Sequence, residues 1–214
     1  MGKSSQGVFG HWSGKVGNVV GRVRQGQNIY AIYQPNVANP RTASQMATRN
    51  KFTLITKFGS QVLAALQVGF ADLDGYKHGT PLSSFIGYNL KNPNVIVDNQ
   101  GVLELQYSYV MLSQGSVELP LSPSATLDSN TVNVTWTDNS GTGKAEETDK
   151  AYLCVYNPAK KSALFAYVAA RSARNGSMTL PAAWNGDSVE AWFFMSKADG
   201  KPCSPSTYLG SLNL

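Results

Sequence analysis

The chain has 214 residues, of which 42% are hydrophobic and 14% are charged, so it can form a core and global disorder is excluded. Its 18 basic and 13 acidic residues give a net charge of +5. Residues 1–71 hold eight basic residues and no acidic residue, so the rest of the chain sums to −3. The positive charge is therefore concentrated in the N-terminal third.

The beginning of the chain lacks the patterns of a targeting signal. Residues 1–10 contain no apolar run of secretory length, and Gln6 stands where N-myristoylation requires Ser or Thr. The most apolar stretch, residues 55–70, is interrupted by polar residues, so we expect no membrane insertion. We expect synthesis in the cytoplasm, with incorporation into a virion or another assembly left open.

The first predicted element is a β-hairpin within residues 16–34. Valine, isoleucine and tyrosine residues flank Gln25-Gly26-Gln27-Asn28, a sequence typical of a turn at Gly26. Because side chains alternate along a strand, Arg22 and Arg24 are expected on one face of its first strand.

A helix is predicted next, with two overlapping start signals. Asn39 can cap a helix with Pro40 at its first position, or Thr42 can form a capping box with Gln45. Apolar residues at helical spacing continue to about Val68, and Gly69 ends the pattern. We expect one long helix whose apolar side chains need cover on two sides, either from the chain itself or from a second subunit.

The remaining sequence reads as a polar connection followed by strands. Residues 72–80 are polar and rich in glycine, which suggests a link between two structural parts. Strands are predicted at residues 94–97, 102–112, 131–137, 151–156, 162–169, 177–180, 188–196 and 206–212.

We therefore predict a mainly β protein with one long helix. The expected parts are a basic, glycine-rich hairpin and helix segment at 1–71, a connection at 72–100 and an antiparallel β-sandwich at 101–214. The sandwich resembles a fibronectin type III or immunoglobulin-like module, on the basis of Trp136, Trp184 at a corner and the strand that contains Trp192.

Residues suited to catalysis or metal binding are few. His11 and His78 are expected in exposed loops, Asp72-Leu73-Asp74-Gly75 lacks the remaining calcium ligands, and Glu146-Glu147-Thr148-Asp149 is expected to be a solvated loop neutralised by neighbouring lysines. No nucleophile, phosphate-loop or zinc motif is present. We predict no enzymatic activity, catalytic residue, metal, cofactor or small-molecule substrate. A free, buried Cys154 is favoured over a Cys154 to Cys203 disulfide bond.

The basic segment has two functional interpretations. It can bind a protein partner, including further copies of the chain, or it can bind the phosphates of nucleic acid without sequence preference. The predicted contact residues are Lys15, Arg22, Arg24, Arg41, Gln45, Arg49, Lys51 and Lys57. A third interpretation is a carbohydrate-binding sandwich that uses Trp184, Trp192 or Tyr208.

The pattern Asn39-Pro40-x-Thr42-x-x-Gln45-x-x-x-Arg49, together with residues 14–21 and 206–210, resembles an uncharacterised family of about 210 residues found in Bacteroidetes. The resemblance implies no activity, and its occurrence in phage-like contexts implies an assembly role. Our leading hypothesis is a non-enzymatic structural protein that self-associates or attaches through its basic segment, as a phage virion component or a subunit of a bacterial filament or surface assembly.

Overall fold

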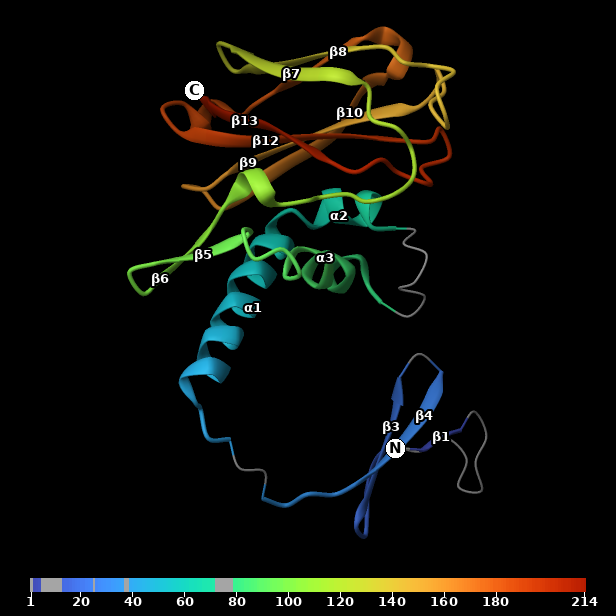
Figure 1. Cartoon of the computed structure of the whole chain (residues 1–214), viewed down its shortest axis with the longest axis vertical. Coiled ribbons are helices and arrows are strands. Elements are labelled where there is room, and N and C mark those ends of the chain that lie inside the picture. The colour runs from blue at the N-terminus through green and yellow to red at the C-terminus, as the bar shows by residue number, and fades with distance from the viewer. Residues whose placement is uncertain (1, 5–12, 25, 37–38, 72–78) are drawn as a thin grey trace. The chain divides into compact units, whose positions relative to one another are not determined.

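The computed structural model describes residues 2–4, 13–24, 26–36, 39–71 and 79–214 (Figure 1). The chain forms two compact units, Met1–Ala43 and Ser44–Leu214. The sequence analysis grouped the helix with the hairpin over residues 1–71, whereas the structure groups it with the β-sandwich. The reason is that the apolar face of the helix packs on the sandwich.

The smaller unit contains a four-stranded antiparallel sheet with the strand order β1-β4-β3-β2. Its strands are β1 (Gly2–Ser4), β2 (Gly14–Val16), β3 (Val19–Arg24) and β4 (Gln27–Ile32). The predicted hairpin is confirmed as β3 and β4, and Gly26 lies between them with φ +72°. β2 and β1 extend this hairpin on its two sides, which the sequence analysis did not predict.

The prediction of one long helix is wrong. The chain instead forms α1 (Ala43–Gln61) and α2 (Leu63–Gly69), with Val62 between them at φ −100° and ψ 19°. Val62 is buried, as are Ile55 and Phe58 before it and Leu66 after it. The change of direction at Val62 lets both helices place apolar side chains in the same core.

The beginning of α1 distinguishes the two predicted start signals. α1 starts at Ala43, directly after Thr42, and Arg41 has a left-handed backbone with φ +49°. Pro40 is therefore not the first helical residue, and the start at Asn39 and Pro40 is wrong.

A third helix, α3 (Pro81–Asn89), was not predicted. Thr80 caps it: the Thr80 hydroxyl accepts a hydrogen bond from the Ser83 N–H at 3.2 Å, and the Ser83 hydroxyl accepts one from the Thr80 N–H at 2.8 Å. The sequence signal was missed because Ser83 occupies the position where a capping box usually has Glu or Gln.

The larger unit also contains the β-sandwich and a separate hairpin. One antiparallel sheet has the order β10-β9-β12-β13, a second has the order β11-β8-β7, and β5 pairs only with β6 among the described residues. The bounds are β5 (Ile96–Asn99), β6 (Val102–Leu105), β7 (Leu121–Asp128), β8 (Thr131–Thr137), β9 (Lys150–Asn157), β10 (Ser162–Ala170), β11 (Asn175–Thr179), β12 (Ser188–Ser196) and β13 (Thr207–Asn213). The described part of this unit also has three short 3-10 helices, at Tyr107–Tyr109, Arg171–Ala173 and Ala182–Trp184.

Most predicted strands agree with the structure to within about two residues, with two clear exceptions. The strand predicted at 102–112 is confirmed only over residues 102–105, because β6 ends at Leu105 and the 3-10 helix Tyr107–Tyr109 follows. β7 was missed because Ser122, Pro123 and Ser124 make its first half look like a loop. β7 nevertheless pairs with β8 through a register shift between Leu121 and Ser124.

The larger unit has three layers, which explains why β9 and β12 are buried on both faces. Leu153, Val155 and Ala191 face the β11-β8-β7 sheet. Cys154, Tyr156 and Trp192 point to the opposite side, where they pack with helix residues including Ile55 and Leu66. Figure 1 shows α2 and α3 on the side of the sandwich opposite to β7 and β8.

Candidate interaction surface

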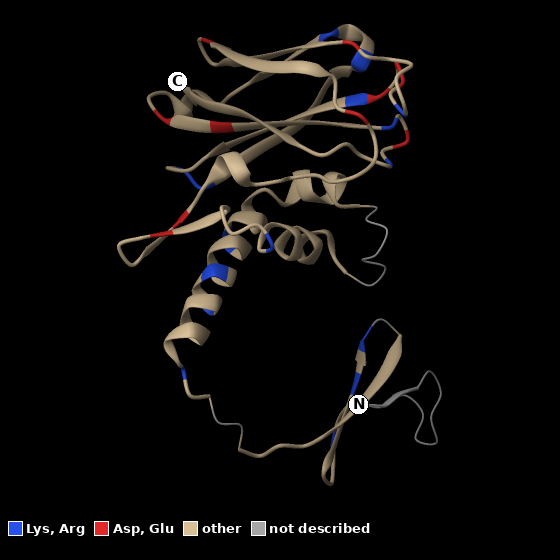
Figure 2. Cartoon of the chain, in the orientation of Figure 1, with Lys and Arg blue, Asp and Glu red and all other residues tan. Residues whose placement is uncertain are grey.

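The smaller unit carries the whole net charge of the protein. Residues 1–43 contain five basic residues and no acidic residue, whereas residues 44–214 contain 13 of each. In Figure 2 the acidic residues that the structure describes lie on the sandwich and the β5–β6 hairpin, and none lies on β2, β3, β4 or α1. The division into compact units therefore sharpens the charge asymmetry of the sequence.

Strand register brings three of the predicted contact residues together. Lys15 pairs with Val20 across β2 and β3, and Val20 shares a face of β3 with Arg22 and Arg24 because side chains alternate along a strand. All three basic residues are exposed. We call Lys15, Arg22 and Arg24 the basic face, and its formation agrees with the expectation that Arg22 and Arg24 lie on one side.

An aromatic residue supports this face at its edge. The Lys15 ammonium lies 3.6 Å from the centroid of the Tyr33 ring, within the range of a cation–π interaction. The Tyr33 N–H donates a hydrogen bond to the Asn18 carbonyl at 2.7 Å, which fixes Tyr33 beside the β2–β3 turn. The ring is 39% exposed, so the basic face includes a surface on which a planar group can stack.

The opposite face of the same sheet carries exposed aliphatic side chains, beside Tyr30 and the buried Asn28 of β4. Val16 pairs with Val19, and Val19 pairs with Ile32, so the three side chains form a row across β2, β3 and β4. They are 66%, 38% and 78% exposed, respectively. We call these three residues the aliphatic row. The row was not predicted, although Val23 between Arg22 and Arg24 is a signal of a two-faced strand.

The other five predicted residues lie outside the basic face. Arg41 precedes α1, and four residues lie on that helix: Gln45, Arg49, Lys51 and Lys57. The first eleven residues of α1, 43–53, are exposed on every side. Their hydroxyls are satisfied within the helix, since Thr48 and Thr53 donate to the carbonyls four residues earlier.

The structure divides the α1 residues between two sides of the helix. Gln45 and Arg49, one turn apart as expected, line a shallow hollow with Phe52, which is 51% exposed. Lys57 lines another hollow with Leu54 and with Val102 of β6. Lys51 lies in the lining of neither hollow, so the four α1 residues do not share one hollow.

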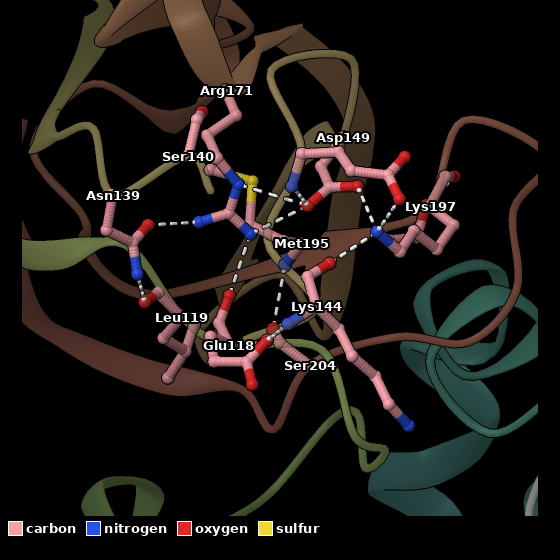
Figure 3. A network of polar contacts seen from close by, with 12 residues as sticks. Glu118, Leu119, Asn139, Ser140, Lys144, Asp149, Arg171, Met195, Lys197 and Ser204 are labelled. Carbon is pink, nitrogen blue, oxygen red and sulfur yellow. Dashed lines mark hydrogen bonds and ion pairs between the residues drawn. The ribbon is translucent and has the colours of Figure 1, made fainter. Parts of the chain in front are cut away.

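One predicted solvated loop contains a buried ion pair. Asp149 is fully buried and lies 3.0 Å from the guanidinium of Arg171, which is also fully buried (Figure 3). The Arg171 guanidinium also donates to the Asn139 side chain and to the Glu118 carbonyl. The prediction that residues 146–149 are all solvated is therefore wrong for Asp149, and these contacts connect loops of the sandwich.

A cluster of tyrosines surrounds Glu190 on the helix side of β12. The Tyr208 hydroxyl donates to Glu190, and the Tyr156 hydroxyl donates to the Gln61 side chain at 2.6 Å. The pKa of Tyr107 is raised to about 12, chiefly by burial and further by electrostatic interaction with Tyr156 and Glu190. Burial and the hydrogen bond to Glu190 also raise the pKa of Tyr208. The phenols of Tyr107 and Tyr208 stay protonated near pH 7, and the hydrogen bond from Tyr156 to Gln61 links α1 to the sheet.

Several other predicted residues take no part in a surface site. Trp184 and Trp192 are buried, so neither ring offers a face for sugar stacking, and Tyr208 is partly buried against the helix-side core. Cys154 and Cys203 are both free and buried, so the alternative of a disulfide bond is wrong. His11, His78 and the sequence 72–75 lie outside the described residues.

Two further kinds of site are absent from the described residues. None of the described helices has the length and apolar character needed to span a bilayer. In the same residues, no three His, Cys, Asp or Glu side chains are grouped as metal ligands.

Comparison with known proteins gives a family without an activity. No curated protein matches the sequence. A family of unknown function, DUF6266, matches residues 10–210, a range that includes most of the smaller unit and nearly all of the larger one. The chain therefore belongs to the family of unknown function DUF6266.

Proposed function

We propose that this protein is a non-enzymatic assembly protein that joins further copies or a larger structure through its N-terminal unit. The observation that carries the proposal is the sheet of that unit, which exposes a basic face on one side and an aliphatic row on the other. A sheet with two exposed faces of different chemistry is suited to contact with partners.

The small core of the N-terminal unit supports this proposal. Ile29 is the one apolar side chain that is buried among the unit's described residues. A unit of 43 residues with so little buried apolar surface gains little stability from its own packing. A partner that covers one of its faces supplies the burial that the unit lacks.

In this proposal the larger unit is the part of each copy that stays exposed on the assembly. Its seven strands in two antiparallel sheets support an immunoglobulin-like sandwich, and its core is extensive. We propose an assembly of the kind formed by a phage virion or by a bacterial filament or surface structure.

Sedimentation of the full chain tests this function. We expect the average mass to rise above the 23.0 kDa of one chain as the concentration increases from about 10 µM to 1 mM. The double variant Arg22→Gln/Arg24→Gln tests whether the basic face takes part in the association. A constant mass of one chain over this range contradicts self-association.

The second candidate function is sequence-independent binding of nucleic acid, and the basic face with Tyr33 favours it specifically. Three cations on one face can neutralise phosphates, while the Tyr33 ring can stack on a base. Binding of this type weakens steeply with salt, by a slope of about 0.9 for each phosphate contact on duplex DNA.

Titration of labelled single-stranded and duplex DNA at rising salt tests the second function. We expect Arg22→Gln/Arg24→Gln to weaken binding. The slope of affinity against salt concentration is expected to fall by the equivalent of about two phosphate contacts. The variant Lys160→Gln/Lys161→Gln removes two charges from the larger unit and is expected to bind like the wild type. Absence of binding at about 50 mM salt rejects this candidate.

A further inference from the structure

We propose that the aliphatic row is the contact surface between two copies of this chain, whose N-terminal sheets pack face to face. The inference rests on the proposed function and makes it more specific, because it names a second copy as the partner and three residues as the contact. The basic face is left on the outside of the pair.

The register of the sheet places the side chains of the aliphatic row next to one another. Val16, Val19 and Ile32 are direct neighbours on three adjacent strands, so their exposed side chains form a continuous surface. Val23, four residues beyond Val19 on the same face of β3, is 47% exposed and extends the apolar surface along the strand. Aliphatic side chains on the inner faces of two stacked sheets form the core of a β-sandwich.

The distribution of charge over the sheet favours a second copy as the partner. No charged side chain of β2, β3 or β4 lies on the face that contains the aliphatic row, since Lys15, Arg22 and Arg24 all point to the other side. Two copies packed through the row keep their basic faces apart, whereas contact through the basic faces would bring like charges together. An acidic partner is attracted to the basic face, and this leaves the uncharged row to an uncharged surface such as itself.

The same separation argues against a lipid surface as the occupant. Peripheral membrane segments place basic residues beside the apolar residues that enter the bilayer, so that both contact the membrane at once. Here the Lys15, Arg22 and Arg24 side chains point away from the apolar face. A membrane contacted by the row would not be contacted by the basic face.

The symmetry and strength of the contact follow from its shape. Val19 is the middle residue of the row, so a two-fold axis near Val19 places Val16 of each copy against Ile32 of the other. Four partly exposed side chains offer on the order of 350 Å² per copy, less than half of the roughly 800 Å² of a standard interface. The pair is therefore weak, and it becomes effective where many copies are held together.

A charge placed in the row tests the inference with a closely matched control. Val16→Lys puts a like charge into both halves of the contact, and we expect it to abolish the rise in mass during sedimentation. Val102→Lys makes the same change at the start of β6 in the larger unit, where Val102 is 61% exposed against 66% for Val16. This control is expected to associate like the wild type.

A cysteine at the predicted axis gives a second measurement that does not depend on added charge. In Val19→Cys the new thiols of two copies face each other, so mild oxidation is expected to yield a disulfide-linked dimer within minutes. Val102→Cys is the control, and the native cysteines contribute little because both are buried. Equal cross-linking of the two variants contradicts the contact.

The outcomes separate this inference from the proposed function. If the wild type associates, Val16→Lys has no effect and Arg22→Gln/Arg24→Gln prevents association, then the assembly function stands and the aliphatic row is not the contact. If the wild type remains a monomer up to about 1 mM, both are overturned. A circular dichroism spectrum equal to that of the wild type shows that each variant is folded.

Discussion

Arg171 and Asp149 form an ion pair in which Nη2 lies 3.0 Å from Oδ2 and neither side chain is exposed to solvent (Figure 3). The Arg171 Nε donates to the same carboxylate oxygen at 3.1 Å, and Nη1 donates to the Asn139 Oδ1 at 2.5 Å. The Lys197 ammonium lies 3.4 Å from the other oxygen of Asp149. Two buried charges are thus compensated inside the sandwich.

Replacement of Arg171 by methionine is expected to destabilise the larger unit strongly. The variant leaves the Asp149 carboxylate buried without its main partner, a change that typically costs about 3–5 kcal/mol. Urea unfolding followed by tryptophan fluorescence measures the loss. Lys160→Met is the control, because Lys160 is about half exposed and lies 3.9 Å from Asp187 in a partly exposed pair, which contributes about 1 kcal/mol or less. Similar losses in both variants contradict the role of the buried pair.

Gly69→Ala is expected to disturb the end of α2. A Cβ at this position overlaps the Leu112 carbonyl oxygen and lies 2.6 Å from the Ser113 Cβ, so the backbone of residues 112–113 must move. Overpacking of this kind costs roughly 1–3 kcal/mol.

Gly59→Ala in α1 gives the comparison for Gly69. Its Cβ meets side chains, with Leu82 Cδ1 at 2.7 Å, and the alanine gains about 1 kcal/mol of helix propensity. Urea midpoints are expected to fall clearly for Gly69→Ala and only slightly for Gly59→Ala. A larger fall in the urea midpoint for Gly59→Ala than for Gly69→Ala shows that the backbone at residues 112–113 moves easily to accept the Cβ.

The tyrosine cluster predicts a loss of stability at high pH. The pKa of Tyr107 is raised to about 12 by burial, by Tyr156 and by Glu190, while an unfolded tyrosine has a pKa near 10. The folded state favours the protonated phenol, so its stabilising effect is complete below pH 10 and decreases as the pH rises through about 12.

Thermal unfolding between pH 8 and pH 12 measures this effect. The unfolding temperature of the wild type is expected to fall above pH 10, and Tyr107→Phe is expected to fall less steeply. Tyr109→Phe is the control because the Tyr109 ring is 49% exposed. Identical slopes for the wild type and Tyr107→Phe reject the assignment to Tyr107.

Neither thiol is expected to react in the folded protein. Burial raises the pKa of Cys154 to about 12, so its reactive thiolate is scarce at pH 8. Cys203 is 5% exposed and its Sγ lies 3.3 Å from the Val68 carbonyl oxygen. A thiol reagent is expected to modify almost no cysteine in buffer and two per chain in urea. Fast modification of one thiol in buffer shows that its surroundings open readily.

The sequence predicted the candidate surface in part. Arg22 and Arg24 were placed on one face correctly, because two residues of one strand that are separated by one position must share a side. Lys15 joins them only through the pairing of β2 with β3. The aliphatic row was missed for the same reason, since it crosses three strands and its residues become neighbours only when the turns set their register.

Local periodicity determined the hairpin, the positions of most strands and the concentration of positive charge at the N-terminus. These properties depend on residues a few positions apart, so they can be read from the sequence. Only the tertiary structure decided that the helix divides at Val62, that α1 and α2 belong with the sandwich, and that Asp149 is buried beside Arg171. Each of these depends on contacts between distant parts of the chain. The chain changes direction at Val62 so that α1 and α2 share one core, and Asp149 is buried because Arg171 compensates its charge.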